Sequence, residues 1–293
     1  MRVHLRPRGG TRLTLAIDIG GATRIYPVIG DPIAQVQTPR LINPLFAEHG
    51  LDIVSVPVHT PADRLRDVWE ALRVTPNVAG IAVTVPHKVS AAGLCSSLTD
   101  AAQAVGAVNT VRRAEDGAMH GALFDGVGFV EGLGDERKRL EGSTVLLIGA
   151  GGAGRAIAHA LAAEKIARLH IVDERSDAAA MAASMVNQGK GCAIATTAWP
   201  DFASCGVVIN ATPLGLKPGD AMPLPEDCIR TDMLIADIAA LDRETPLLAA
   251  ARRLGCATSD GDAMLKAQLG LVAGFIAGLP AGALLSQDPA AIR

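Results

Sequence analysis

The chain has 293 residues and a formal net charge of −3, and 49% of its residues are apolar but only 3% aromatic. This length accommodates two domains, and the apolar fraction suits helices packed on sheets. No block of lysine or arginine is present to bind nucleic acid phosphates, and few aromatic side chains are available to stack on bases, so nucleic acid binding is not expected.

The cysteines are odd in number and scattered, without a CxxC pair: Cys95, Cys192, Cys205, Cys228 and Cys256. This pattern predicts neither a disulfide framework nor a metal site and is typical of the reducing cytoplasm. Residues 1–24 lack the uninterrupted apolar segment of a signal peptide, and we assign them no role. Pro280 and four glycines interrupt the apolar run 269–285, which predicts a buried helix and a loop rather than a membrane span. We expect a cytoplasmic protein, either a monomer or a homodimer.

Residues 25–112 alternate short apolar runs with segments of helical periodicity. Residues 38–50 place apolar side chains at helical spacing before a glycine, and residues 61–74 begin with Pro and carry one apolar face. Alternating strands and helices predict a mostly parallel sheet. The polar, turn-rich stretch 113–121 is interpreted as a joint between two domains. The apolar runs are residues 25–30, 52–58, 80–86 and 107–113.

A second and stronger strand–loop–helix unit begins at residue 143 with the sequence STVLLIGAGGAGRAIAHALAAE. Three further apolar runs follow it, each of which ends at a polar or glycine-containing loop: residues 169–174, 207–213 and 234–239. A C-terminal helix from residue 262 places Leu265, Leu269 and Val272 on one face. We therefore predict an α/β protein with two domains.

A glycine-rich loop follows the strand Val145–Ile148 and opens a helix, the context in which GxGxxG predicts dinucleotide binding. Gly149 permits a tight turn, Gly151 lets the backbone approach a pyrophosphate, and Gly154 allows the helix to pack closely on the strand. The N–H groups and the dipole of the helix N-terminus favour the anion. We predict a dinucleotide site rather than an empty turn, formed by Gly149, Ala150, Gly151, Gly152, Ala153 and Gly154.

Asp173 ends the strand after this helix, about twenty residues beyond the glycine loop. A carboxylate there accepts hydrogen bonds from the adenosine ribose and repels a 2′-phosphate, which favours NAD over NADP. Arg175 opposes this preference, because a guanidinium pairs well with a phosphate.

Lys88 and Asp125 are the candidates for proton transfer. Lys88 follows the VTVP strand end, and Asp125 precedes two glycines near the junction between the two halves of the chain. Taken alone, such a lysine is commonly a surface residue and such an acid a turn residue. A nicotinamide domain nevertheless needs a partner that moves the alcohol proton while hydride leaves, and a Lys–Asp pair facing the cleft can do so.

Seven motifs, in order, resemble those of the shikimate/quinate dehydrogenases over residues 25 to 280: GDPIAQVQTP, VTVPHK, GAVNTV, FDGVGF, LLIGAGGAGRA, INATPLG and GDAMLKAQ. The resemblance implies a mostly parallel α/β substrate domain (residues 1–122 and 262–293) and a Rossmann-type dinucleotide-binding domain (residues 123–261). The C-terminal helix would return to the first domain. The implied reaction is hydride transfer between NAD and a ring hydroxyl of shikimate, quinate or a related cyclic hydroxy acid.

The resemblance also implies residue roles, with no metal. Lys88 and Asp125 match the catalytic pair of the family. The substrate contacts match Thr38, Thr84, Asn109 and Gln268. Beyond the glycine loop, Asp173 and Arg175, the cofactor contacts match Thr212, Ile238, Gly261 and Met264.

Several positions depart from the family pattern where it carries hydrogen-bonding side chains. One of two serines that hold the substrate carboxylate in the family is Val36, and the other is Thr38. Each lost hydrogen bond to a charged ligand group removes roughly 1.5–3 kcal/mol of binding. Either Gln35, Gln37 or a main-chain amide replaces the lost anchor, or the substrate is another cyclic hydroxy acid or polyol. The other departures are Ala82, Leu123, Phe124 and Ala240.

Two other functions are weighed beside this enzyme. A non-catalytic NAD-binding sensor derived from a dehydrogenase would explain the thinned substrate wall, but such a sensor needs neither Lys88 nor Asp125. Another Rossmann-type dehydrogenase or reductase, acting on an acyclic or folate-like substrate, would share the cofactor half. It would not explain the order of the N-terminal motifs.

Overall fold

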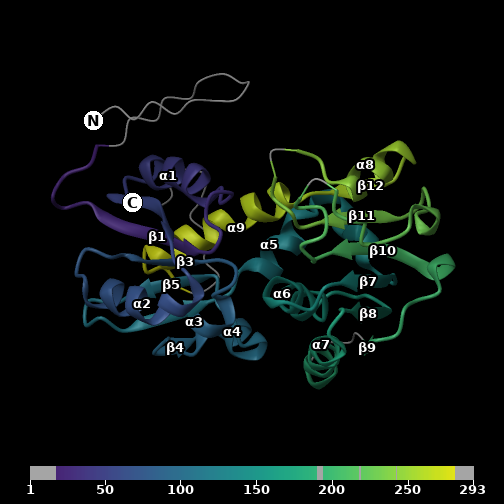
Figure 1. Cartoon of the computed structure of the whole chain (residues 1–293), viewed down its shortest axis with the longest axis horizontal. Coiled ribbons are helices and arrows are strands. Elements are labelled where there is room, and N and C mark those ends of the chain that lie inside the picture. Colours follow the sequence, from purple (N-terminus) through teal and green to yellow (C-terminus); the bar gives the residue numbers. More distant parts are fainter. Residues whose placement is uncertain (1–17, 190–193, 218, 242, 281–293) are drawn as a thin grey trace.

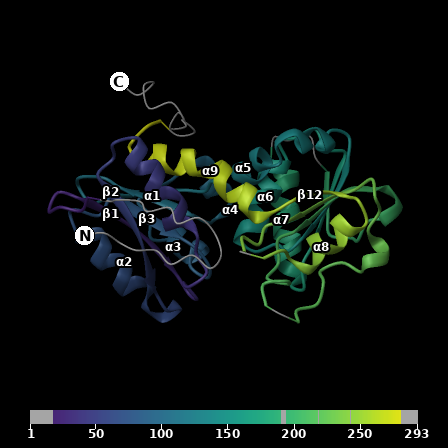
Figure 2. The ribbon, with the colours of Figure 1, turned by 90° about the horizontal axis from the view of Figure 1, so that it is seen from above.

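The computed structural model describes residues 18–189, 194–217, 219–241 and 243–280, which form two α/β units, each built on a six-stranded sheet (Figure 1). The units lie side by side, and helix α9 (Gly261–Ile276) runs from the second unit across to the first (Figure 2). The predicted α/β class with two sheets is confirmed.

The first sheet is mixed, with the strand order β2-β1-β3-β5-β6-β4. Strand β1 pairs in parallel with β2 and β3, and β5 runs antiparallel to both of its neighbours. Its strands are β1 (Arg24–Gly30), β2 (Ile53–His59), β3 (Gly80–Val83), β4 (Ser97–Leu98), β5 (Thr110–Arg113) and β6 (Met119–Ala122). The α-helices of this half are α1 (Thr38–Glu48), α2 (Leu65–Val74), α3 (Lys88–Ala92) and α4 (Asp100–Val105).

Alternation along the strands of the first sheet buries both of its faces. Val28 belongs to a core cluster with Phe46 of α1 and Phe275 of α9, whereas the next residue, Ile29, packs with Trp69 of α2. Successive side chains of a strand point to opposite faces, so β1 contributes to two cores at once. Helix α9 therefore completes the core of the first unit, as the sequence predicted for a returning C-terminal helix.

The second sheet is entirely parallel, with the order β12-β11-β10-β7-β8-β9, which is the doubly wound Rossmann arrangement. Its strands are β7 (Thr144–Ile148), β8 (Arg168–Val172), β9 (Ile194–Thr196), β10 (Cys205–Asn210), β11 (Leu234–Asp237) and β12 (Ala257–Ser259). Helices α5 (Asp125–Gly132), α6 (Gly152–Leu161), α7 (Ser176–Gln188) and α8 (Pro246–Arg253) belong to this half. Short 3-10 turns occupy Ala62–Arg64, Gly134–Leu140, Phe202–Ser204 and Glu226–Cys228.

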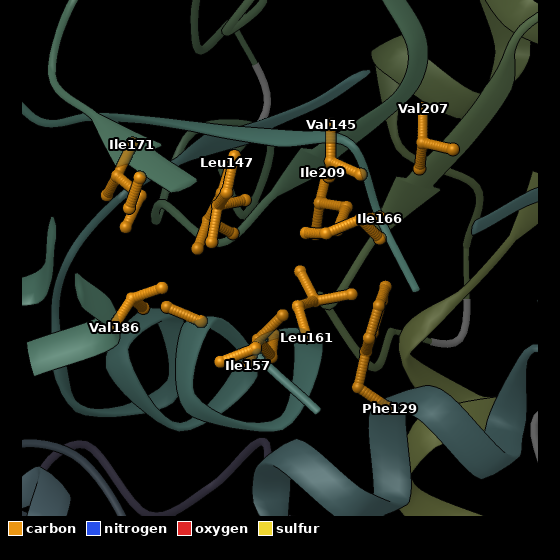
Figure 3. Packing of buried hydrophobic residues seen from close by; sticks show 14 of the residues in the cluster. Phe129, Val145, Leu147, Ile157, Leu161, Ile166, Ile171, Val186, Val207 and Ile209 are labelled. Atoms are coloured by element: carbon orange, nitrogen blue, oxygen red, sulfur yellow. The ribbon is translucent and has the colours of Figure 1, made fainter. Parts of the chain in front are cut away.

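The core of the second unit lies between β7 and α6. Val145 and Leu147 of β7 face Ile157 and Leu161 of α6, and Phe129 of α5 closes one side of this cluster (Figure 3). A fully covered parallel sheet requires continuous apolar strands, which explains why these runs are almost free of polar residues.

The polar stretch 113–121 comprises the end of β5, a tight turn over residues 114–118 and the start of β6, so its interpretation as a joint between domains is wrong. Gly117 has a φ of +83°, and the carboxylate of Asp116 accepts a hydrogen bond from the N–H of Ala118. Turn chemistry of this kind serves a hairpin as well as a linker, and the sequence pattern does not separate the two.

Glycines on α5 let this helix press against both of its neighbours. A Cβ atom added at Gly126 would lie 2.1 Å from the carbonyl oxygen of Ala156 in α6, and one at Gly128 would lie 2.9 Å from that of Met264 in α9. Such contacts exclude any side chain at these positions. The DGVGF sequence therefore fixes the N-terminus of α5, which carries Asp125, between α6 and α9.

The described residues also bear on membrane spans, metal groups and cysteines. Within the described ranges, no helix is both long and apolar enough to cross a membrane. In the same part of the chain, no group of three His, Cys, Asp or Glu side chains is arranged to hold a metal ion. Four cysteines there are free thiols, and Cys192 lies outside the described residues.

Candidate active site

A large cavity of about 1060 Å³ extends from the first unit to the second. Its walls include residues that follow the carboxyl ends of parallel strands, the position at which doubly wound sheets bind ligands. Of the residues predicted to form the site, all but Ala150 and Gly154 line this cavity: Thr38, Thr84, Lys88, Asn109, Asp125, Gly149, Gly151, Gly152, Ala153, Asp173, Arg175, Thr212, Ile238, Gly261, Met264 and Gln268.

Lys88 and Asp125 form an ion pair in the wall of this cavity, in which Lys88 Nζ donates to Asp125 Oδ2. The side chains retain only 15% and 5% of their accessible surface, respectively. Each residue is the first of a helix: Lys88 begins α3, and Asp125 begins α5. The His87 ring bonds the carbonyl oxygen of Thr60 at 2.7 Å and anchors the turn before Lys88. A proton-carrying group and its carboxylate partner are thus held in place.

Asn109 connects this pair to α9. Its Nδ2 donates to Asp125 Oδ1 and to Gln268 Oε1, both at 2.9 Å, while its Oδ1 accepts from the N–H of Phe124 at 3.1 Å. An amide nitrogen carries two hydrogens, so both are committed to protein acceptors. In this arrangement Asn109 orients Asp125 and Gln268. Asn109 also lines the cavity, and the substrate contact implied by the resemblance stays a prediction.

The substrate side of the cavity combines a few polar groups with an apolar wall. Thr38 and Gln37 line it at the start of α1, and Thr84 lines it after β3. Gln35 also lines it, but its amide Nε2 donates to the carbonyl oxygen of Pro32 at 2.8 Å, which ties that side chain back to its own loop. Gln37 is therefore the better placed of the two glutamines to contact a ligand.

The departures from the family pattern fall into two groups. Val36, Ala82 and Ala240 line the cavity, so at these positions an apolar surface faces the ligand. Leu123 and Phe124 do not line it: both are buried, and the Phe124 ring packs edge-on against Phe275 at 5.8 Å between centroids. These two substitutions change the core rather than the wall.

The glycine loop provides a cradle that fits a pyrophosphate. Gly149 has a φ of +102°, and a Cβ atom at Gly154 would lie 2.0 Å from the carbonyl oxygen of Gly149. A Cβ atom at Gly151 would meet nothing within 4 Å, so the space there is open to the cavity. No side chain caps the N-terminus of α6, which leaves its N–H groups for an anion. A Cβ atom at Gly152 would lie 3.6 Å from Lys88 Cβ, so the loop adjoins the ion pair.

Asp173 borders the glycine loop at the end of β8. Its Oδ2 accepts from the N–H of Ala150 at 2.7 Å, and its Oδ1 accepts from the N–H of Arg175 at 2.9 Å. Ala150, a residue of the loop itself, is buried and takes part through this N–H rather than as cavity wall. The guanidinium Nε of Arg175 lies 3.6 Å from Asp173 Oδ1, so the two charges partly compensate each other.

Gly261 closes the cavity where α9 begins. A Cβ atom at this position would lie 2.4 Å from the carbonyl oxygen of Ile238, so only glycine allows α9 to start against that loop. Asp237 fixes the same loop, because its Oδ1 accepts from the N–H of Ala239 at 3.1 Å. Ile238, Gly261 and Met264 consequently form one apolar patch of the cavity beside the glycine loop.

Some polar or aromatic lining residues had no signal in the sequence, among them Tyr26, Thr110 and Trp199. Tyr26 is the only tyrosine of the sequence and is fully buried. Burial raises the pKa of Tyr26, and the Thr110 side chain offsets part of this effect. A tyrosine or threonine within an apolar strand is normally interpreted as a core residue. That Tyr26 and Thr110 line the cavity is therefore evident only from the fold.

Comparisons with known sequences bear on this site. Residues 28–111 match the family described as the shikimate dehydrogenase substrate binding domain. The NADP(+) shikimate dehydrogenase of Rubrobacter xylanophilus is 33% identical over 252 residues, which cover 84% of this chain and 88% of that protein. The corresponding enzyme of Anaeromyxobacter sp. is 36% identical over 273 residues, which cover 90% and 94%, respectively.

Solved structures share the whole fold. A shikimate 5-dehydrogenase from Listeria monocytogenes, in complex with shikimate and NAD, has a TM-score of 0.78 at 27% identity and covers 91% of this chain and 96% of its own. The quinate dehydrogenase of Corynebacterium glutamicum, in complex with NAD, has a TM-score of 0.77 at 26% identity and covers 88% of this chain and 94% of its own. A ligand-free 5-ketofructose reductase of Gluconobacter sp. has a TM-score of 0.76 at 27% identity and covers 92% of this chain and 96% of its own.

Proposed function

Because the chain belongs to the shikimate dehydrogenase family and is an oxidoreductase acting on CH–OH groups, we propose that it oxidises a ring hydroxyl of shikimate, quinate or a related cyclic hydroxy acid, reversibly and with NAD. The observation that carries the proposal is the Lys88–Asp125 ion pair in the wall of the cavity that also contains the glycine loop. We assign residues 1–122 and 262–293 to substrate binding and residues 123–261 to cofactor binding.

The proton is moved by Lys88. A bound nicotinamide ring supplies or accepts the hydride, as it does in dehydrogenases generally. In the direction of carbonyl reduction, the Lys88 ammonium donates a proton to the oxygen on which negative charge develops, and in the direction of oxidation the amine takes the hydroxyl proton back. Asp125 holds Nζ in position, while Asn109 holds the other oxygen of the carboxylate.

The proton-transfer step is tested by removing the amine. Lys88→Ala is expected to lower kcat by at least about a hundredfold, the usual contribution of a positioned acid or base. Lys165→Ala is the matched control, because the Lys165 side chain is 83% exposed and lies outside the cavity. Unchanged turnover in Lys88→Ala, with shikimate or quinate as substrate, would overturn the assignment.

The preference for NAD is supported by the charges beside the adenosine end of the cavity. The Asp173 carboxylate and the adjacent Glu174 line this end, and both repel a 2′-phosphate. Arg175, a cation that lines the cavity beside them, already lies next to Asp173. We expect kcat/KM to be higher with NAD than with NADP. Asp173→Asn should shift the ratio towards NADP by at least about tenfold, and an unchanged ratio would contradict the role of Asp173.

The substrate carboxylate is expected to contact Thr38 and Gln37, because Gln35 is held by its own loop. Initial rates with shikimate, quinate and a decarboxylated analogue of each measure how much the acid contributes. Equal rates for an acid and its analogue would show that the wall of Val36, Ala82 and Ala240 has lost the anchor. The substrate would then be a neutral polyol or keto sugar, as the name of the 5-ketofructose reductase indicates for that protein.

No contact within the described ranges favours a non-catalytic sensor. A protein that only binds NAD has no use for a lysine held against a buried aspartate in the cleft. Calorimetric NAD binding without NADH formation from any cyclic hydroxy acid or polyol would establish the sensor instead.

A further inference from the structure

Trp199 is a large apolar side chain left exposed at the edge of the cavity. It retains 54% of its accessible surface, although most apolar residues of its size are buried. It lines the same cavity as Asp173, Glu174 and Arg175. The motif that predicted the dinucleotide site contains no aromatic residue and assigns Trp199 no role.

The position of Trp199 follows from the order of the parallel strands. Gly149 comes directly after β7, Asp173 directly after β8, and Trp199 three residues after the end of β9. These strands are adjacent and parallel, and β9 lies beside β8 at one edge of the second sheet (Figure 1). Their carboxyl ends therefore present the pyrophosphate cradle, the ribose-binding carboxylate and the indole in sequence along one edge.

The loop that carries Trp199 is held in place. The carbonyl oxygen of Ala198 accepts a hydrogen bond of 2.7 Å from Nδ1 of His170, a buried residue of β8. The indole also packs against the Phe202 ring at 6.1 Å between centroids, with the planes tilted by 46°. The indole is thus both exposed to the cavity and fixed by contacts on its own side, as a stacking platform requires.

From this placement we propose that Trp199 is the platform on which the adenine ring of the dinucleotide stacks. The inference rests on the proposed function, because it takes the pyrophosphate at the glycine loop and the adenosine ribose at Asp173. An elongated dinucleotide bound in this way has its nicotinamide near Lys88, and its adenine extends past Asp173 towards Trp199. Stacking of a base on an aromatic ring depends on the π faces and is independent of the ribose phosphate, so NAD and NADP would gain equally.

The first test uses the fluorescence of the two tryptophans. Trp69 is 3% exposed within the first unit and does not line the cavity, so adenosine 5′-monophosphate is expected to quench Trp199 alone. Trp69→Phe should keep the quenching, and Trp199→Phe should abolish it. Quenching that survives in Trp199→Phe would overturn the proposal.

The second test measures affinity by calorimetry. Trp199→Ala is expected to raise the Kd of NAD and of adenosine 5′-monophosphate by about 5- to 100-fold, the usual effect of removing a stacking ring. Trp199→Phe should stay within a few fold of the wild type, and nicotinamide mononucleotide should bind all three proteins alike. Thermal unfolding identifies any variant that fails to fold, in which case the Phe variant and the quenching data decide.

The outcomes separate the two proposals. Absence of NAD binding in the wild-type chain would contradict the proposed function itself. Wild-type NAD binding with an unaltered Kd in Trp199→Ala would contradict only the platform. A changed oligomeric state in Trp199→Ala, with unaltered nucleotide affinity, would identify the exposed indole as a contact between protein chains and would also overturn the platform.

Discussion

Asn109 Nδ2 donates a hydrogen bond of 2.9 Å to Asp125 Oδ1. Through this contact and its bond to Gln268, Asn109 couples the first sheet to α5 and α9, the two helices that meet at the boundary of the units. Asp125 positions Lys88 and is itself positioned by Asn109, whose two amide hydrogens are both used in hydrogen bonds to the protein.

Asn109→Leu keeps a similar volume and removes these hydrogen bonds. Asp125 and the N–H of Phe124 would each lose a buried partner, at a cost of about 1–3 kcal/mol in unfolding free energy for each group. We expect kcat to fall by about a hundredfold, because small displacements of catalytic groups have effects of this size. Asn77→Ala, at an exposed asparagine, is the control for stability and rate. A variant with wild-type kcat would show that Lys88 and Asp125 position each other without Asn109.

Two glycines of the cofactor loop are expected to respond differently to alanine. Gly151→Ala places its Cβ in open space at an extended backbone position, so the melting temperature should be unchanged while the Kd of NAD rises at least about tenfold. Gly154→Ala forces a Cβ atom to 2.0 Å from a carbonyl oxygen and should lower the unfolding free energy by about 1–3 kcal/mol. Thermal unfolding and calorimetry on both variants measure the contrast. If Gly151→Ala bound NAD as tightly as the wild type, the pyrophosphate would have to bind somewhere other than at Gly151.

Val36→Ser tests the altered substrate wall. Val36 lines the cavity, and a hydroxyl there would add one donor towards a bound carboxylate. A hydrogen bond to a charged group contributes roughly 1.5–3 kcal/mol, so kcat/KM for shikimate should rise at least about tenfold. The decarboxylated analogue is the internal control and should react at the same rate with both proteins. Equal gains for both compounds would show that the hydroxyl acts on something other than the acid.

The sequence predicted those parts of the site that are local in the chain. The glycine loop, its strand and the acid at the end of β8 lie within one βαβ unit, and spacing alone identifies them. Lys88 and Asp125 are 37 residues apart, and no spacing rule pairs them: the need for a proton-transfer partner suggested the pair, and the resemblance to a family supported it before the fold did. One of the two acceptors of the Asn109 amide is Gln268 of α9, which is 159 residues away in the sequence. No local sequence pattern predicts this contact.

Leu123, Phe124 and Trp199 show where prediction from the sequence failed: two residues were wrongly placed in the cavity wall, and one cavity residue was missed. The sequence suggested that Leu123 and Phe124 thin the substrate wall, yet both pack in the core, because a motif position does not state which way a side chain faces. Trp199 follows a three-residue edge strand, too short for its period to be recognised. Its place beside Asp173 appears only when β9 is paired with β8.

Asp237 provides a prediction about pH. Burial raises the pKa of this carboxyl above its ordinary value of 3.8, although hydrogen bonds from Asn210, Ala239 and Thr245 oppose the shift. The folded protein then binds more protons than the unfolded chain between pH 3.8 and the raised pKa, so the contribution of Asp237 to stability falls as the pH rises through this window.

Denaturant unfolding of the wild type and Asp237→Asn at a series of pH values isolates this contribution. The unfolding free energy of the wild type relative to the variant should decrease from pH 3.8 upwards and become constant above the folded pKa. Because the asparagine does not titrate, the shared pH dependence of all other groups cancels in the difference. An increase over the same window would mean that the three hydrogen bonds outweigh burial and that the loop between β11 and α8 is held by an ionised carboxylate.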